Sequence, residues 1–223
     1  MKKYKVFVAI GILGLTLLGV LYYDATKKPH HTNNEWHTRE HNDEVRDGDL
    51  IFQVSLSEQS KAIKLATKSK YSHCGIIYKE GNDYSVFEAV QPVKHTPLNK
   101  WIARGQNGHY VIKRLKNAEQ VLTPEVLEKM KQVSQEFIGK DYDSTFEWKD
   151  NKIYCSELIW KVYQRGAGLE IGKLEKLRDF DLTHQEVKKK MKKRYGDKIP
   201  MNENVISPKS IFESELLETI KMN

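Results

Sequence analysis

Hydrophobic and polar positions divide the chain into three parts with different patterns. Residues 6–23 form an apolar run without a single charged side chain. Residues 24–45 are polar and show almost no regular spacing of apolar positions. From residue 46 to residue 223, short apolar stretches alternate with turn signals, which is typical of one folded domain. The pattern therefore predicts an apolar segment at 1–23, a polar tether at 24–45 and a globular body at 46–223.

Strand patterns fill the first half of the body. Residues 74–78 and 84–90 are rich in apolar residues and flank the turn sequence Gly81-Asn82-Asp83, which predicts a β-hairpin. The remaining elements predicted in this half are strands at 50–56 and 109–115, a short helix at 57–70 and a helical turn at 96–105.

The second half of the body has helical periodicity. Thr123 can cap a helix that has Pro124 in its first turn and ends at Gly139. A further helix is predicted at 155–168, where apolar residues recur on one side, and the Ser-Pro pair at 207–208 caps another. Because the strands precede the helices, we expect an α+β fold with an antiparallel sheet.

The apolar segment at 6–23 has the length of a membrane helix. As a helix, its 18 residues would span about 27 Å, close to the thickness of the bilayer core. A cleaved signal peptide has a similar pattern, but no A-x-A-like cleavage site follows. A buried helix of a cytosolic protein is the third interpretation. We expect a retained anchor with the body outside the cytoplasm, or a secreted body if the segment is cleaved.

The net charge of +7 is concentrated in one segment. Residues 188–194, with the sequence KKKMKKR, carry six positive charges. No RNP motif, zinc knuckle or helix-turn-helix signature accompanies them, so a nucleic-acid partner is not expected. The segment is typical of a solvated helix face, or of a surface attracted to an anionic membrane.

The tether contains one pattern associated with metal binding. His37, Glu40 and His41 match the H-x-x-E-H motif of one metalloprotease class. That site needs a stable helix with apolar packing and a third ligand, whereas the neighbouring residues here are polar. We therefore interpret the motif as part of a flexible tether and predict no metal or organic cofactor.

Candidate chemistry centres on Cys155, at the predicted start of a helix. Unpaired N–H groups at a helix N-terminus lower the pKa of a thiol and can also hold an oxyanion. His73 lies at the start of a predicted core strand, and Glu88 lies on the neighbouring strand of the hairpin. A carboxylate within an apolar strand is costly to bury without a partner, and His73 is the obvious one. A structural cysteine and a core histidine remain the alternative interpretation.

Strand alternation separates the two cysteines. If His73 points into the site, Cys74 is expected on the opposite face of the sheet. Cys74 is then a packing residue, and a disulfide with Cys155 is not expected.

An ordered series of motifs runs through the body: GDLIF, YSHCGIIY, VFEAVQPVKH, YVIKRL, IGKDYD and YCSELIWKVYQ. Together they resemble the YiiX group of bacterial proteins over about residues 46–212. That group lies in the circularly permuted branch of the NlpC-type, papain-like cysteine hydrolases. The resemblance implies a papain-like α+β fold in which an antiparallel sheet or barrel packs against helices. The chain order His73, Glu88, Cys155 agrees with the permutation.

The resemblance also implies roles for individual residues. Cys155 of YCSE is the nucleophile, His73 of YSHCG the base and Glu88 of VFEAV the third member. Tyr71 would help to hold the oxyanion or line the pocket, and Asp49 of GDLIF would be structural. The permuted branch is similar to the lecithin:retinol acyltransferase relatives as well, which implies acyl chemistry on lipid-like or cell-wall amides.

The resulting expectation is a membrane-tethered cysteine hydrolase of amide or ester bonds that acts on lipid-linked or peptidoglycan-derived substrates of the cell envelope. An acyltransferase with the same triad is an alternative that the sequence does not separate. A catalytically idle module that binds envelope lipid or peptidoglycan is another.

Overall fold

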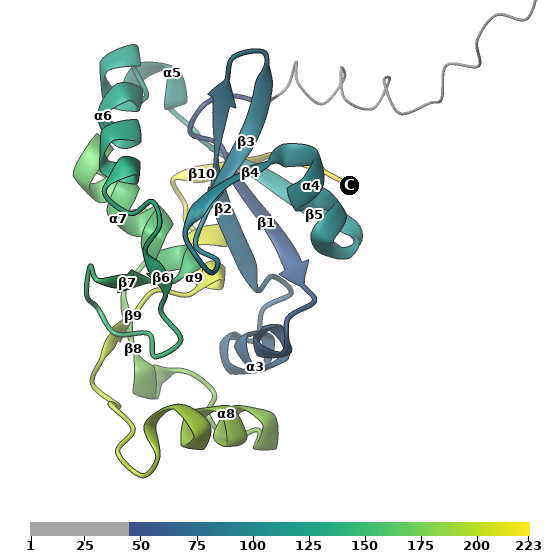
Figure 1. Ribbon diagram of the computed structural model, residues 1–223, viewed down its shortest axis with the longest axis vertical. Helices are drawn as coiled ribbons and strands as arrows, with labels where there is room; N and C mark the ends of the chain where they lie inside the picture. Colours follow the sequence, from purple (N-terminus) through teal and green to yellow (C-terminus); the bar gives the residue numbers. More distant parts are fainter. Residues whose placement is uncertain (1–44) are drawn as a thin grey trace, which may run out of the picture. The chain divides into compact units, whose positions relative to one another are not determined.

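A computed structural model describes residues 45–223, which form an antiparallel sheet with helices on both of its faces (Figure 1). The sheet has six strands in the order β10-β5-β1-β2-β3-β4, and every neighbouring pair is antiparallel. The strands are β1 (Leu50–Ser55), β2 (His73–Glu80), β3 (Asp83–Glu88), β4 (Lys94–Pro97), β5 (Gly105–Leu115) and β10 (Leu217–Met222).

The predicted α+β class is confirmed, but the sheet is open. Its edge strands β4 and β10 do not pair with each other in the described part of the chain, so the sheet does not close into a barrel. The hairpin of β2 and β3 is formed as the turn sequence predicted, with Ile77 opposite Val86. Strand β10 occupies the edge next to β5, and the sequence analysis had assigned no strand there.

Two apolar cores lie on opposite faces of the sheet. Alternation along β2 sends Cys74 and Ile76 into the larger core, together with apolar residues of α6 (Pro124–Gln135) and α7 (Cys155–Ala167). Ile77 enters the smaller core, where it joins Trp101 of α4 (Leu98–Arg104). The sheet is thus sandwiched between the pair α6 and α7 and the single helix α4.

Close packing between α6 and α7 fixes the position of α7. A Cβ atom at Gly166 would lie 2.5 Å from Cγ of Met130, so this contact requires glycine. Gly168 ends α7 in the left-handed conformation, with φ 70°. The apolar side of α7 is fully buried, as its periodicity predicted, and comprises Leu158, Ile159, Val162 and Tyr163.

Asp49 has the structural role that was expected of it. Its two carboxylate oxygens accept hydrogen bonds of 2.7 Å from Nε and Nη2 of Arg114. The backbone N–H of Arg46 donates a third, at 2.8 Å. Asp49 therefore ties the start of β1 to the neighbouring strand β5.

A pair of helices and several short elements complete the fold. Helix α3 (Glu58–Thr67) packs against α8 (Gln185–Tyr195), below the sheet in the view of Figure 1. The remaining short elements are α5 (Ala118–Val121), β6 (Asp141–Tyr142), β7 (Lys152–Ile153), β8 (Glu175–Lys176), a 3₁₀ turn (Leu177–Asp179), β9 (Asn204–Val205) and α9 (Pro208–Phe212).

Predictions for residues 1–44 lie outside the described residues. They include the apolar anchor or signal segment, most of the tether and its H-x-x-E-H motif. Within residues 45–223, we find no helix whose length and apolar character would allow it to cross a bilayer.

Candidate active site

Cys155 is the first residue of α7, and hydrogen bonds hold this helix start in place. The backbone N–H of Ile206 donates to the Tyr154 hydroxyl at 3.0 Å, and the Ser156 hydroxyl donates to the Ile206 carbonyl at 2.8 Å. Cys155 is only 3% exposed. Its sulfur therefore sits at the positive end of a fixed helix, where a thiolate is stabilised.

His73 and Glu88 come together at the ends of two neighbouring strands. The distance between His73 Nε2 and Glu88 Oε2 is 2.6 Å. The imidazole also stacks on Trp101, with ring centroids 5.8 Å apart and planes inclined by 23°. Both side chains thus lie on the α4 side of the sheet, and the carboxylate orients the imidazole.

Glu88 is fully buried, yet it stays ionised. Besides His73, it accepts hydrogen bonds from Thr96 Oγ1 at 2.7 Å, Trp101 Nε1 at 2.9 Å and Arg104 Nη2 at 2.5 Å. Burial alone raises its pKa, but the bonds from His73, Arg104 and Thr96 lower that pKa to about 2. The expected partnership between this carboxylate and His73 is therefore present.

The sulfur of Cys155 meets His73 across the end of strand β2. The imidazole and the sulfur interact closely enough for each to shift the pKa of the other. Burial would lower the pKa of His73, but its bonds to Cys155 and Glu88 raise that pKa to about 9. The pKa of Cys155 moves the opposite way, because the Cys74 thiol donates to it and His73 stabilises its negative charge. These opposite shifts favour the thiolate form of Cys155 beside a protonated His73.

Cys74 corrects one prediction. It was expected to lie on the wrong side of the strand for Cys155, but α7 packs on the face of the sheet to which Cys74 points. Cys74 and Cys155 interact closely enough to shift each other's pKa, and both are free thiols. His73 is the first residue of β2 and also interacts with Cys155. Cys74 is thus part of the site.

An apolar cavity of about 70 Å³ opens beside Cys155. Cys155 and Tyr154 form one end of its wall, and α3 and α8 form its sides. Most of the remaining wall is hydrocarbon, contributed by side chains such as Ala62, Ile63, Leu177, Leu182, Val187 and Met191. The cavity suits an apolar group next to the reactive sulfur.

Tyr71 and Tyr142 occupy different places relative to the cavity. Tyr71 packs against Phe212 with ring centroids 4.6 Å apart and stacks on His109, and in the described chain it is not among the residues that line the cavity. Tyr142, which the sequence reasoning missed, does line the cavity beside Cys155. Gln59 Nε2 donates to the Tyr142 hydroxyl at 2.9 Å, so the tyrosine proton is available to a ligand. The sequence signal that could have identified Tyr142 is its position in the motif IGKDYD, which lies shortly before α7.

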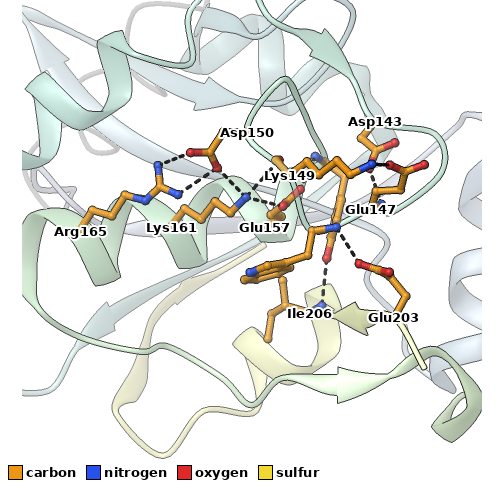
Figure 2. A network of polar contacts seen from close by, with 11 residues as sticks. Asp143, Glu147, Lys149, Asp150, Glu157, Lys161, Arg165, Glu203 and Ile206 are labelled. Carbon is orange, nitrogen blue, oxygen red and sulfur yellow. Dashed lines mark hydrogen bonds and ion pairs between the residues drawn. The ribbon is translucent and has the colours of Figure 1, made fainter. Parts of the chain in front are cut away.

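A network of ionic side chains, partly buried, holds the first turns of α7 in place (Figure 2). Lys161 Nζ donates to Glu157 Oε1 at 2.7 Å and to Asp150 Oδ1 at 2.8 Å. Glu157 also accepts the backbone N–H of Tyr154, at 3.4 Å. Glu157 and Lys161 are 0% and 3% exposed in their side chains. This network fixes the first turn of the helix that carries Cys155.

The ion pair makes a prediction about thiol reactivity. Iodoacetamide is expected to alkylate Cys155 at a rate already near its plateau at pH 7, because the thiolate is formed well below the usual thiol pKa. In Cys74→Ala, the pH at which the rate is half-maximal should rise, since Cys74 makes the largest contribution to the lowered pKa of Cys155. The rate is followed by mass spectrometry, with Cys155→Ala as the control. A half-maximal rate near pH 8.5 in the natural protein would contradict the ion pair.

A solved structure similar to this chain is described as a metalloprotein. It is the crystal structure titled metalloprotein yiiX from Escherichia coli O157:H7, DUF1105, with 45% sequence identity and a TM-score of 0.77. The match covers 81% of this chain and 98% of that one. Within residues 45–223, no group of three or more His, Cys, Asp or Glu side chains is arranged to hold a metal ion. The described residues therefore do not fit a metal centre.

Two sequence comparisons point to the same group of proteins as the structural comparison. The uncharacterized protein YiiX of Escherichia coli (strain K12) is 46% identical over 173 residues, which cover 78% of this chain and 84% of the relative. The family model of permuted papain-like amidase enzymes, YaeF/YiiX, matches residues 44–221. This chain belongs to the permuted papain-like amidase family YaeF/YiiX, C92.

Proposed function

We propose that this protein is a cysteine hydrolase that cleaves an amide or ester bond in an acyl-bearing amphiphile of the cell envelope. Cys155, His73 and Glu88 would carry the reaction. One observation supports this substrate class above others: the cavity beside the reactive sulfur is lined almost entirely by hydrocarbon. The proposed localisation, with the body outside the cytoplasm and tethered through residues 6–23, rests on the sequence pattern alone.

Acylation begins with the thiolate. Cys155 Sγ attacks the carbonyl carbon of the substrate, and the C–O double bond opens to an oxyanion. The backbone N–H of Cys155 at the helix start and the Tyr142 hydroxyl are the candidate donors to that oxyanion. His73 gives its proton to the leaving amine or alcohol as the bond to it breaks. The products of this step are an acyl-thioester on Cys155 and a neutral His73.

Deacylation reverses the role of His73. The neutral imidazole takes a proton from water, whose oxygen attacks the thioester carbonyl. Collapse of the second tetrahedral intermediate releases the carboxylic acid and restores the thiolate and imidazolium. Glu88 keeps the imidazole oriented through both steps, because its other three hydrogen bonds fix the carboxylate.

The cavity predicts a preference for acyl chain length. Each methylene buried in it adds about 0.8 kcal/mol, or roughly fourfold in kcat/KM, until the cavity is full. Ala62→Phe should fill part of the cavity and shift the preference to shorter chains. The measurement is kcat/KM for p-nitrophenyl esters of increasing chain length. Ala103→Phe, on the exposed side of α4, is the matched control and should leave the profile unchanged. A profile that Ala62→Phe does not alter would assign the acyl group to another site.

Trapping the acyl-enzyme tests the proposed function directly. The protein is incubated with a cell-envelope lipid extract, quenched in acid and digested, and the mass added to the Cys155 peptide is read. An added acyl mass supports the proposal, and its absence together with an unlabelled Cys155 favours a module that only binds. Repeating the reaction with an added amine separates hydrolysis from acyl transfer, because only the transferase forms the new amide.

A further inference from the structure

Helix α8 has two faces of contrasting chemistry. Val187 and Met191 lie one turn apart, are 3% and 5% exposed, and line the cavity that leads to Cys155. Lys188, Lys189, Lys192 and Lys193 are exposed on the other side of the helix. The apolar face is therefore already used by the protein, and the cationic face is turned to the outside.

Few carboxylates neutralise this cationic face. The one acidic residue of α8, Glu186, is already paired with Lys61 at 2.6 Å. Lys192 is paired with Asp197, beyond the end of the helix. For Lys188, Lys189 and Lys193, no ion pair with a carboxylate is found among residues 45–223. Exposed lysines on successive turns of α8 are therefore available to interact with a partner outside the protein.

Two further cations connect the outer face with the cavity. Lys190 and Arg194 are half-buried and form part of the cavity wall. The Arg194 guanidinium lies over the Phe146 ring, 4.5 Å from its centroid, and Phe146 belongs to the same wall. Positive charge therefore accompanies the apolar surface from the outside of α8 to the space beside Cys155.

We propose that α8 is a docking element that rests on the surface of an anionic lipid bilayer. The cationic face would contact lipid head groups, and the cavity behind it would receive the apolar part of a lipid drawn from that surface. The use of the cavity rests on the proposed function, whereas the docking itself does not depend on catalysis.

The physics of this docking is electrostatic. A lysine close to an anionic bilayer strengthens binding by about fivefold, and the attraction falls off within a Debye length of about 8–10 Å. Because Val187 and Met191 are buried inside the protein, α8 has no free apolar face to insert among acyl chains. Docking should therefore need anionic lipid and should be lost at high salt.

Lysine footprinting of the full chain tests the proposal. The protein is reconstituted into nanodiscs of phosphatidylcholine alone or with phosphatidylglycerol, and the acetylation rate of each lysine is read by mass spectrometry. Lys188, Lys189 and Lys193 are expected to react at least about fivefold more slowly in the anionic discs, and at equal rates in both discs at 1 M salt. Lys129, exposed on α6, is the internal control and should not change.

The proposal would be overturned by equal acetylation of these lysines in both kinds of disc, whether or not they are protected there. It would also be overturned if duplex DNA protected the same lysines of the soluble protein equally well. The variant Lys188→Glu/Lys189→Glu should remove the protection of Lys193, whereas Lys129→Glu should keep it. The footprint needs no turnover, so protection of α8 without acyl-enzyme formation would refute the proposed function alone. Hydrolysis of bilayer substrates without protection would refute only the docking.

Discussion

Replacement of Cys155 by alanine is expected to lower kcat/KM for acyl esters and amides by about 10⁴-fold or more. The reason is that this sulfur lies at the N-terminus of α7, where His73 and Cys74 lower its pKa. In enzymes that use a nucleophile and a base as a unit, loss of either member removes most of the rate, and only binding and oxyanion stabilisation remain. The measurement is hydrolysis of a soluble p-nitrophenyl ester, combined with mass detection of the acyl-enzyme.

Cys74→Ala provides the matched control for this experiment. It also removes one buried thiol from the same site, but it keeps the nucleophile, His73 and Glu88. We expect it to retain an acyl-enzyme and to lose activity mainly at acidic pH, where the pKa of Cys155 limits thiolate formation. An unchanged rate in a folded Cys155→Ala variant, judged by its thermal midpoint, would assign the reaction to another group.

Replacement of Lys161 by methionine is expected to lower the free energy of unfolding by about 3 kcal/mol at pH 7. Removing one partner of a buried ion pair costs about 3–5 kcal/mol, because the other is left without compensation. The lower end applies here, since burial raises the pKa of Glu157 to about 8, so this group is already largely protonated at pH 7 and the variant mainly loses the hydrogen bonds that Lys161 donates. Methionine can also retain the contact with Trp148, over whose ring Lys161 Nζ lies 4.9 Å from the centroid. Urea unfolding measures the change.

The pH dependence distinguishes this explanation from simple loss of packing. The folded pKa of Glu157 is above its ordinary value of 4.5, so the stability that it contributes as a neutral acid is complete below pH 4.5 and is lost as pH rises through 8. Above pH 8 the natural protein still has Lys161 to pair with the carboxylate, whereas Lys161→Met does not. The difference in stability should therefore grow above pH 8. It should be smaller throughout in Glu157→Gln/Lys161→Met, and an effect that does not vary with pH would contradict the role of the pair.

The sequence predicted the main members of the candidate site because each follows from a local rule. Cys155 stands at a helix start, and Glu88 is a carboxylate in an apolar strand whose neighbouring strand begins with His73. Such rules depend only on periodicity and on the cost of burying charge. The resemblance to a permuted family added the chain order, and the structure brings the three side chains into contact.

Features that depend on packing between distant segments could not be predicted in the same way. Strand alternation placed Cys74 correctly opposite His73, but it did not say on which face α7 would pack or that His73 could reach around the strand end. Tyr142 enters the site through its contact with Gln59, a residue 83 positions away in the sequence. The strand β10 and the open edge of the sheet likewise depend on pairing with β5, which no local pattern specifies.

The position of Glu88 has a consequence for the order in which the site is assembled during synthesis. Its hydrogen-bond partners are His73, Thr96, Trp101 and Arg104, which all belong to the neighbouring β2, β4 and α4. This half of the site can therefore form from one short, early stretch of the nascent chain, while Cys155 follows some 50 residues later. Until α7 docks, the thiol has neither His73 nor Cys74 beside it and keeps the low reactivity of an ordinary cysteine. The nascent protein thus acquires its reactive sulfur only as folding is completed.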